Sequence, residues 1–222
     1  MQQDCWLNIN KPTGPSSALA VAIVKKSHKA KKAGHGGTLD PFASGVLPIA
    51  LNKATKTSNQ VVNCSKSYYF RLQFGEFRDT DDCTGNITDI SNTRPTTTQI
   101  ITALPNFVGT ITQQPSQFSA IKINGKRAYK LARQKLDFTM PTRQVDIFAI
   151  SLLYHCRDYA DFVVDCGKGT YIRTLARDLC KSMQTCGYVA ILQRLRVGNF
   201  CLQNSISLDT IKFKSILATI LL

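Results

Sequence analysis

The chain has 222 residues, with 28 Lys and Arg against 14 Asp and Glu, a formal net charge of +14. Hydrophobic residues make up 43%, as in an ordinary globular core, and no apolar run is long enough to span a membrane as a helix. This charge balance indicates a polyanionic partner, with nucleic acid ahead of an anionic membrane surface, although a generally basic proteome would also produce it.

The eight cysteines and three histidines show no metal-binding spacing. No Cys-x-x-Cys pair and no His-x-x-x-His pair is present, which argues against a structural zinc site. The N-terminal residues lack the basic-then-apolar pattern of a secretory signal. We therefore expect a reduced, cytoplasmic protein without metal, cofactor or membrane contact, in which the cysteines fill the core.

The first elements are a short strand and a helix. Residues 6–10 alternate as a strand does and end at Lys11-Pro12. Ser16 or Ser17 can cap a helix that runs into residues 25–32, where five of eight residues are lysine. These lysines are either a solvated helix end that complements the helix dipole or a patch that contacts phosphates.

A glycine- and proline-rich segment follows at residues 34–48 and contains one carboxylate, Asp40, between Leu39 and Pro41. Four glycines and two prolines exclude the interior of a helix or strand, so the backbone must turn sharply or approach a partner closely. Asp40 is either a common turn residue or, in this setting beside His35 and the lysines, a functional carboxylate.

The middle of the chain alternates between helix and strand patterns. Residues 53–62 predict a helix with Ala54, Val61 and Val62 facing inward. Residues 66–75 predict a half-buried strand. Residues 79–86 predict a solvated acidic turn, and they lack the regularly spaced ligands of a calcium-binding loop. Inward positions of the strand are expected at Tyr68, Phe70, Leu72 and Phe74.

The remaining elements continue this mixture. Residues 97–107 predict an amphipathic helix with Ile100, Ile101, Leu104 and Phe107 on one face, and Asn124-Gly125 predicts the turn of a basic hairpin. A short helix is expected at 129–136, strands at 145–153 and 162–166, and a helix after Gly167-Lys168-Gly169. That lone Gly-x-Gly lacks the Walker and Rossmann spacings. Residues 205–222 predict a terminal helix.

Three stretches carry a resemblance to a known family. Residues 34–48, Gly-His-Gly-Gly-Thr-Leu-Asp-Pro-Phe-Ala-Ser-Gly-Val-Leu-Pro, resemble the catalytic motif of the TruB family of tRNA pseudouridine synthases. Residues 115–129 and the run Lys-Gly-Thr-Tyr-Ile-Arg-Thr-Leu at 168–175 resemble further parts of that family. Lys11-Pro12 matches its N-terminal Lys-Pro motif, and the likeness covers residues 7–211.

The resemblance implies roles for individual residues. Asp40 would be the catalytic carboxylate, Arg173 would pair with it, and Tyr68 would stack on the target base. His35 would fill the space left by the flipped nucleotide, although a turn residue that bonds backbone is the alternative. Leu192 would line the base pocket, Tyr171 would help to bind substrate, and Asp82 would lie near Arg173. Phosphate contacts are expected from Lys11, Lys25, Lys26, Lys29, Lys31 and Lys32.

The resemblance also implies the fold and the activity. The fold would be α+β, a mixed, mainly antiparallel sheet with flanking helices and a central catalytic cleft, in a single catalytic domain over residues 1–222 without the family's C-terminal PUA-type domain. The activity would be conversion of uridine to pseudouridine at position 55, in the T-loop of tRNA, by a monomer that binds the T-arm. Two alternatives stay open: a non-catalytic RNA-binding relative, and a pseudouridine synthase for another RNA.

Overall fold

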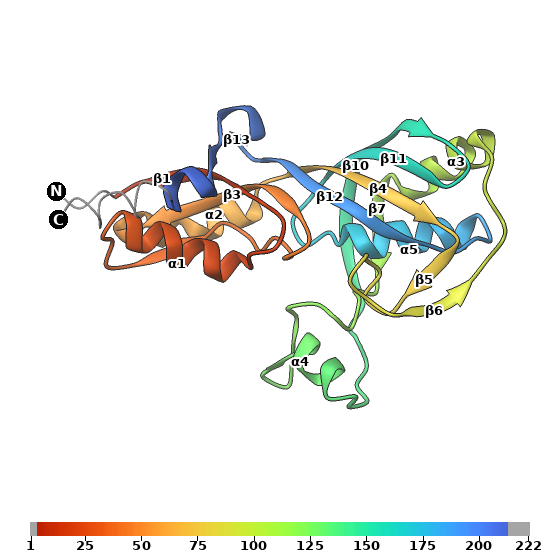
Figure 1. Cartoon of the computed structure of the whole chain (residues 1–222), viewed down its shortest axis with the longest axis horizontal. Coiled ribbons are helices and arrows are strands. Elements are labelled where there is room, and N and C mark those ends of the chain that lie inside the picture. Colours follow the sequence, from red (N-terminus) through yellow and green to blue (C-terminus); the bar gives the residue numbers. More distant parts are fainter. Residues whose placement is uncertain (1–3, 213–222) are drawn as a thin grey trace. The chain divides into compact units, whose positions relative to one another are not determined.

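The computed structural model describes residues 4–212, which form two compact units (Figure 1). The first comprises residues 4–69 and 192–212, and the second residues 70–191. The boundaries between the units fall inside two strands, β4 (Lys66–Phe74) and β12 (Gly187–Val197). The single domain expected over 1–222 stays a prediction.

The first unit is built around β3 (Ser44–Leu51), in which every residue after Ser44 is buried. β3 pairs antiparallel with β1 (Trp6–Lys11) and β2 (Ala33–His35), and parallel with the end of β12 at Arg194↔Gly45. A strand enclosed on both faces reads as a continuous apolar run, which is the character of Val46–Leu51. The other elements are α1 (Ser17–Ser27), η1 (Asn52–Thr57), α2 (Ser58–Asn63), β13 (Phe200–Cys201), η3 (Leu202–Asn204) and β14 (Ile206–Ser207).

In the second unit the strand order is β12-β4-β11-β10-β7. β10 (Arg143–His155) pairs antiparallel with both β11 (Tyr159–Cys166) and β7 (Gly109–Gln113). Phe70 and Phe162 stack in the core with ring centroids 5.0 Å apart. The remaining elements of this body are β5 (Glu76–Arg78), β6 (Ile87–Ile90), α3 (Thr97–Ala103), η2 (Leu104–Phe107) and α5 (Ile172–Ser182).

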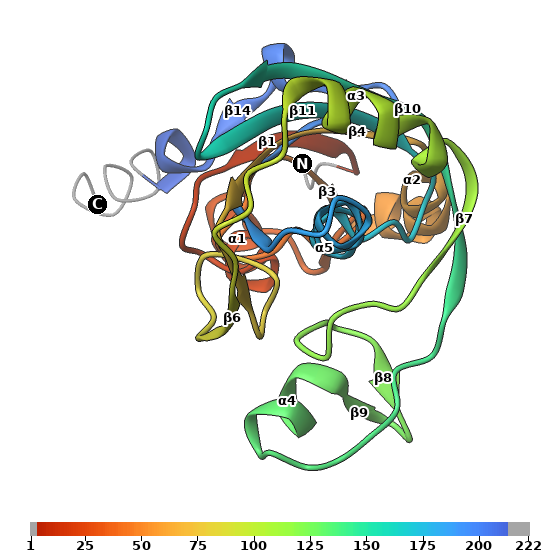
Figure 2. The same cartoon turned by 90° about the vertical axis from the view of Figure 1, so that its right-hand side faces the viewer.

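Residues 114–142 of the second unit connect β7 to β10, and we call this segment the arm (Figure 2). It contains β8 (Lys122–Ile123), β9 (Lys126–Arg127) and α4 (Ala128–Arg133). Asn124 and Gly125 have φ of 48° and 81°, the positive values that a two-residue type I′ hairpin requires. The arm carries six Lys and Arg residues against one Asp.

Most expected elements are confirmed. Ser16 caps α1 by accepting a hydrogen bond from the Leu19 amide, the hairpin forms at Asn124-Gly125, and the four expected inward residues of β4 are buried. The sheet is mixed and mainly antiparallel, with parallel pairs at β1–β14 and β3–β12.

Two residues that were expected to face inward are exposed. Val62 is 37% exposed because the helix before it is 3-10 over Asn52–Thr57, and its tighter period rotates the later residues. Ile101 is 55% exposed because the short α3 and η2 bury only the stripe formed by Ile100 and Leu104. The terminal helix predicted for 205–222 lies largely outside the described residues. Within the part of this segment that the structure describes, residues 208–212 are helical.

All eight cysteines are free, but only Cys166, Cys180 and Cys186 are buried, and Cys83 is exposed, so the core-filling role holds for three of them. Within residues 4–212, no helix is both long and apolar enough to cross a membrane. In the same range, no group of three or more His, Cys, Asp or Glu side chains is arranged to hold a metal ion.

Candidate active site

Asp40 lies in the first unit, on the loop between β2 and β3, with a half-buried side chain. The residue before it is fixed by one hydroxyl: Ser17 Oγ donates to the Leu39 carbonyl at 2.7 Å and accepts from the Leu39 amide at 2.8 Å. The Asp40 carbonyl accepts from the Ala43 amide at 3.1 Å, which closes a turn over Pro41. Hydrogen bonds therefore fix the backbone on both sides of the Asp40 carboxylate.

Two buried cations hold the carbonyls of this loop. Lys11 Nζ donates to the carbonyls of Pro12, Pro15, Pro41 and Ala43, at 2.6 to 3.4 Å. Arg194, 1% exposed, donates to Gly37 and Thr38 at 3.1 Å each and to Val46 at 2.7 Å. Charged donors make strong hydrogen bonds to carbonyls, so the loop that presents Asp40 is rigid.

The burial of Lys11 contradicts the phosphate contact that was predicted for it. Lys11 is 0% exposed and its ammonium faces backbone carbonyls, so it positions the loop instead of neutralising RNA. Burial lowers the pKa of this ammonium to about 8, an effect that the nearby Asp40 charge opposes. The five lysines at 25, 26, 29, 31 and 32 are all exposed, as a phosphate-contacting patch requires.

His35 lies at the end of β2, partly buried, and its Nδ1 accepts a hydrogen bond from the Gly37 amide at 3.3 Å. Burial, reinforced by the Arg194 charge, lowers the pKa of the imidazole. The ring is therefore neutral at physiological pH, with its proton on Nε2. This hydrogen bond to backbone is what the alternative interpretation of His35, as a turn residue, predicts. That His35 fills the space left by the flipped nucleotide stays a prediction.

Tyr68 and Leu192 lie on β4 and β12, which are neighbours in the strand order. Their side chains are 8% and 5% exposed. Two apolar surfaces on adjacent strands can form the walls of a site for a planar base. Stacking of a uracil between them stays a prediction.

Arg173 lies in the second unit, in the first turn of α5, and is 4% exposed. Its Nη1 donates to the Thr80 carbonyl at 2.8 Å and lies 3.2 Å from Asp82 Oδ2, and its Nη2 donates to the Phe118 carbonyl at 3.3 Å. The expected proximity of Asp82 and Arg173 is confirmed. The pairing of Arg173 with Asp40, which belongs to the other unit, stays a prediction.

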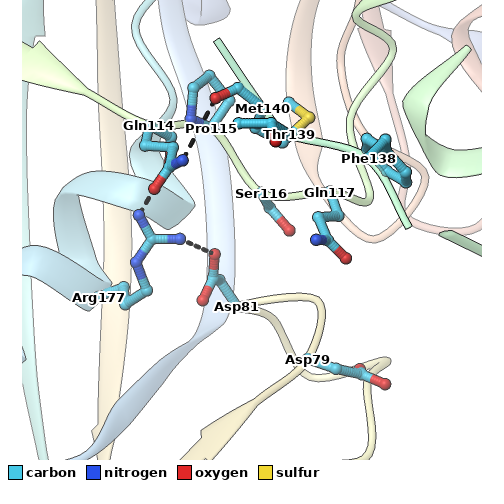
Figure 3. A pocket seen from close by; sticks show the side chains of 10 residues that line it. All are labelled: Asp79, Asp81, Gln114, Pro115, Ser116, Gln117, Phe138, Thr139, Met140 and Arg177. Atoms are coloured by element: carbon cyan, nitrogen blue, oxygen red, sulfur yellow. Dashed lines mark hydrogen bonds and ion pairs between the residues drawn. The ribbon is translucent and has the colours of Figure 1, made fainter. Parts of the chain in front are cut away.

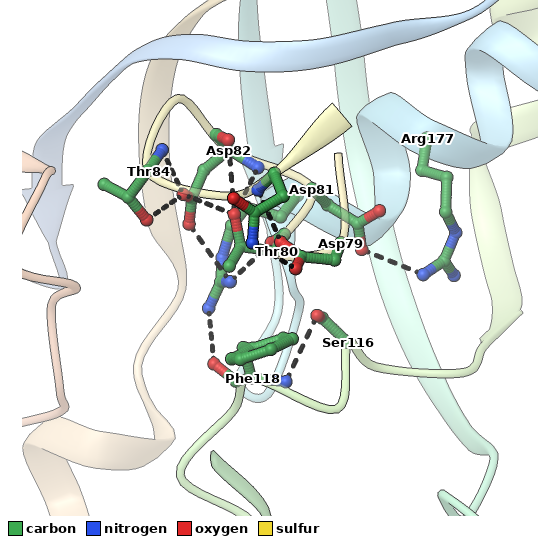
Figure 4. A network of polar contacts seen from close by, with 10 residues as sticks. Asp79, Thr80, Asp81, Asp82, Thr84, Ser116, Phe118 and Arg177 are labelled. Atoms are coloured by element: carbon green, nitrogen blue, oxygen red, sulfur yellow. Dashed lines mark hydrogen bonds and ion pairs between the residues drawn. The ribbon is translucent and has the colours of Figure 1, made fainter. Parts of the chain in front are cut away.

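The acidic turn at 79–86 is only partly solvated, which corrects the expectation from its polarity: residues 80–82 are buried, whereas residues 83, 84 and 86 are exposed. Figure 4 shows the polar contacts of the buried part. Asp82 is 4% exposed, and its Oδ1 accepts from the hydroxyls of Thr80 and Thr84 at 2.8 and 2.6 Å. Asp81 is 6% exposed and pairs with Arg177 at 2.9 Å. Burial raises the pKa of the Asp81 carboxyl to about 6, although Arg177 opposes that shift.

Tyr171 is the residue before α5, and the Gln113 side chain holds its backbone. The Tyr171 amide donates to Gln113 Oε1 at 2.9 Å, and Gln113 Nε2 donates to the Tyr171 carbonyl at 3.2 Å. The Arg143 guanidinium lies 5.4 Å from the centroid of the Tyr171 ring. The start of α5 is thus tied to both strands that flank the arm.

Sequence reasoning missed Arg194, Gln113 and the Asp81–Arg177 pair. One signal was available for Arg194: it lies two residues after Leu192, and therefore on the same face of the strand, where a buried arginine must find buried acceptors. Gln113 and Arg177 gave no local signal, because their partners lie 58 and 96 residues away.

Comparisons with known proteins identify relatives of this chain. Residues 25–172 match the model of the family described as TruB family pseudouridylate synthase, N-terminal domain. The chain is 47% identical over 209 residues to tRNA pseudouridine synthase B of Ehrlichia canis, covering 93% of this chain and 69% of that protein. It is 45% identical over 208 residues to the protein of that name from Caulobacter vibrioides, covering 93% and 67%.

Among solved structures, the chain resembles an H/ACA RNP bound to a substrate RNA containing 2′-deoxyuridine, with a TM-score of 0.73 and 26% identity. The alignment covers all of this chain and 56% of that chain, so this chain spans a little over half its length. The mixed sheet with its flanking helices is the pseudouridine synthase fold. On the extent of the family match and the identity to its members, the chain belongs to the TruB family of pseudouridylate synthases.

Proposed function

We propose that this protein converts uridine to pseudouridine in the T-loop of tRNA, at position 55, with Asp40 as the catalytic carboxylate. The observation that carries the proposal is the immobilised loop around Asp40, whose carbonyls are held by Lys11 and Arg194. Membership of the family and the names of the relatives support the same reaction. A rigid carboxylate is what a glycosyl transfer needs, because preorganisation lowers the cost of reaching the transition state.

The reaction is an isomerisation. The bond between N1 of uracil and C1′ of the ribose breaks, the base turns, and C5 bonds to C1′. The proton on C5 is released and N1 gains one, so atoms and electrons balance without an oxidant or reductant. A carboxylate can serve by attacking the sugar, by attacking the base or by removing a sugar proton.

The other site residues would act around that carboxylate. In this proposal Arg173 pairs with Asp40 in the substrate complex and keeps it ionised. Tyr68 and Leu192 would enclose the flipped uracil, and Tyr171 would bind the nucleotide beside Arg173. The neutral His35 ring would occupy the space that the uridine leaves.

The RNA contacts follow from charge. The exposed lysines at 25, 26, 29, 31 and 32 and the basic arm would neutralise phosphates of the tRNA T-arm without reading sequence. We expect the protein to work as a monomer in the cytoplasm, where the tRNA is.

The test is tritium release from transcribed tRNA labelled at C5 of uridine, with wild type, Asp40→Asn and a matched control, Asp209→Asn. Asp209 belongs to the same unit, and its side chain is 62% exposed. We expect release by wild type and Asp209→Asn, and a loss of roughly 1000-fold or more in Asp40→Asn. A transcript with cytidine at position 55 maps the site, because it should release nothing above background.

Each other outcome points to one alternative. Binding of tRNA without release by any variant would indicate a non-catalytic RNA-binding protein. Release from messenger or ribosomal transcripts, but not from tRNA, would indicate a synthase for another RNA. Equal release by wild type and Asp40→Asn would remove Asp40 from the reaction.

A further inference from the structure

Two arginines on the same face of α5 bind the first residues of the arm, 114–118, which we call its entry. Arg173 and Arg177 lie four residues apart, so their side chains project on one side of the helix. Arg173 contacts Thr80 and Asp82 in the acidic turn and donates to the Phe118 carbonyl in the arm.

Arg177 repeats this arrangement one helical turn further along (Figure 3). Its Nη1 donates to Asp81 Oδ2 and its Nη2 to the Gln114 carbonyl, both at 2.9 Å, and its Nε donates to Asp178 at 3.1 Å. The planar guanidinium can bond two partners in different directions at once, which a lysine ammonium does with less geometric control. Arg177 therefore joins the turn that carries Asp82 to the first residue of the arm.

A cavity of about 350 Å³ lies beside the contacts of Arg177 with Asp81 and Gln114. The arm contributes Ser116, Phe138 and Met140 to its lining, and the acidic turn contributes Asp79 and Asp81 (Figure 3). Where a cavity separates two segments, side-chain packing does not fix their distance, and polar contacts carry the positioning. Nε2 of the Gln114 side chain also donates to the Met140 carbonyl at 3.3 Å, so a shift at Gln114 reaches both ends of the arm.

We propose that Arg177 is a positioning residue of this enzyme: through Asp81 and the Gln114 carbonyl it fixes the entry of the arm against the acidic turn, and so sets the place of Arg173. Asp81 is nine-tenths buried, and removal of Arg177 would leave its carboxylate without this partner, which drives the turn to rearrange. Because Asp82 is the next residue in that turn, the rearrangement would reach Arg173.

The structural part of the proposal is tested without RNA. The arm offers trypsin six basic residues between 122 and 135, and its cleavage rate reports how often the arm opens. The variants are Arg177→Gln, Arg177→Lys and Asp81→Asn, with Lys181→Gln as control, because Lys181 is an exposed cation near the end of the same helix. Fragments are identified by mass spectrometry.

We expect cleavage in the arm to rise about tenfold in Arg177→Gln and by less in Arg177→Lys, with Lys181→Gln unchanged. Faster cleavage throughout the chain would mean global destabilisation, and an unchanged arm would mean that Arg177 does not anchor it. Either result overturns the proposal, and Arg177→Lys, which keeps the charge, allows the test if Arg177→Gln does not fold.

The functional part rests on the proposed function and is measured by tritium release. We expect kcat to fall 10- to 100-fold in Arg177→Gln, as for a small misplacement of a catalytic group, with KM for tRNA within threefold of wild type. A rise in KM at constant kcat would make Arg177 an RNA contact and overturn the proposal. If wild type itself releases no tritium, the proposed function fails, while the trypsin experiment still decides the anchoring role.

Discussion

Gly45 and Arg194 face one another where β3 pairs with β12, and the backbone at Gly45 adopts a φ of 107°. A Cβ at this position would collide with the backbone carbonyl of Arg194. The Arg194 side chain, in turn, binds the carbonyls of Gly37, Thr38 and Val46. The loop that carries Asp40 is thus fixed at both its ends by one arginine whose approach depends on one glycine.

Gly45→Ala should therefore destabilise the protein by roughly 2–4 kcal/mol, through strain at positive φ and the collision with Arg194. The measurement is urea unfolding followed by circular dichroism. Gly34→Ala is the matched control in the same segment, because a Cβ there meets no atom within 4 Å. Equal unfolding midpoints for the two variants would contradict the close approach.

Lys11→Met should separate loop positioning from RNA binding. Because the Lys11 ammonium is buried against carbonyls, its removal should reduce activity and leave the salt dependence of tRNA binding unchanged. A double change of the exposed Lys31 and Lys32 to Gln should make the negative slope of log K against log salt shallower by roughly 1–2, because each lysine is expected to neutralise one phosphate. Fluorescence anisotropy at several salt concentrations measures both slopes, and a reduced slope in Lys11→Met would restore the phosphate role.

Asp81 should make stability depend on pH in a defined direction. Its folded pKa of about 6 lies above the ordinary value of 3.8, so between these values the folded protein keeps a proton that the unfolded chain has released. Wild type should therefore lose stability relative to Asp81→Asn as pH rises through this window, by on the order of 3 kcal/mol in total. Urea unfolding of both proteins at pH 4.5 and 7.5 should capture roughly 2 kcal/mol of this loss, because part of it occurs below pH 4.5. A constant difference between the two proteins would show that Asp81 ionises normally.

The local elements and the family could be predicted from the sequence. The period-two pattern predicted β4, Ser16 or Ser17 predicted the start of α1, and Asn124-Gly125 predicted the hairpin, because each depends on neighbouring residues alone. The resemblance of residues 34–48 to the TruB catalytic motif indicated the family before any contact was known.

The roles of the charged residues could not be predicted from local patterns. Lys11 looks like a surface lysine and Asp79–Asn86 like a solvated turn, yet Lys11 is buried against four carbonyls, and Asp81 and Asp82 are buried against arginines more than 90 residues away. A charge is buried only when its partners surround it, and those partners are brought together by folding. Local patterns carry no record of such distant partners, which is why the anchoring roles of Arg194 and Arg177 emerged only from the structure.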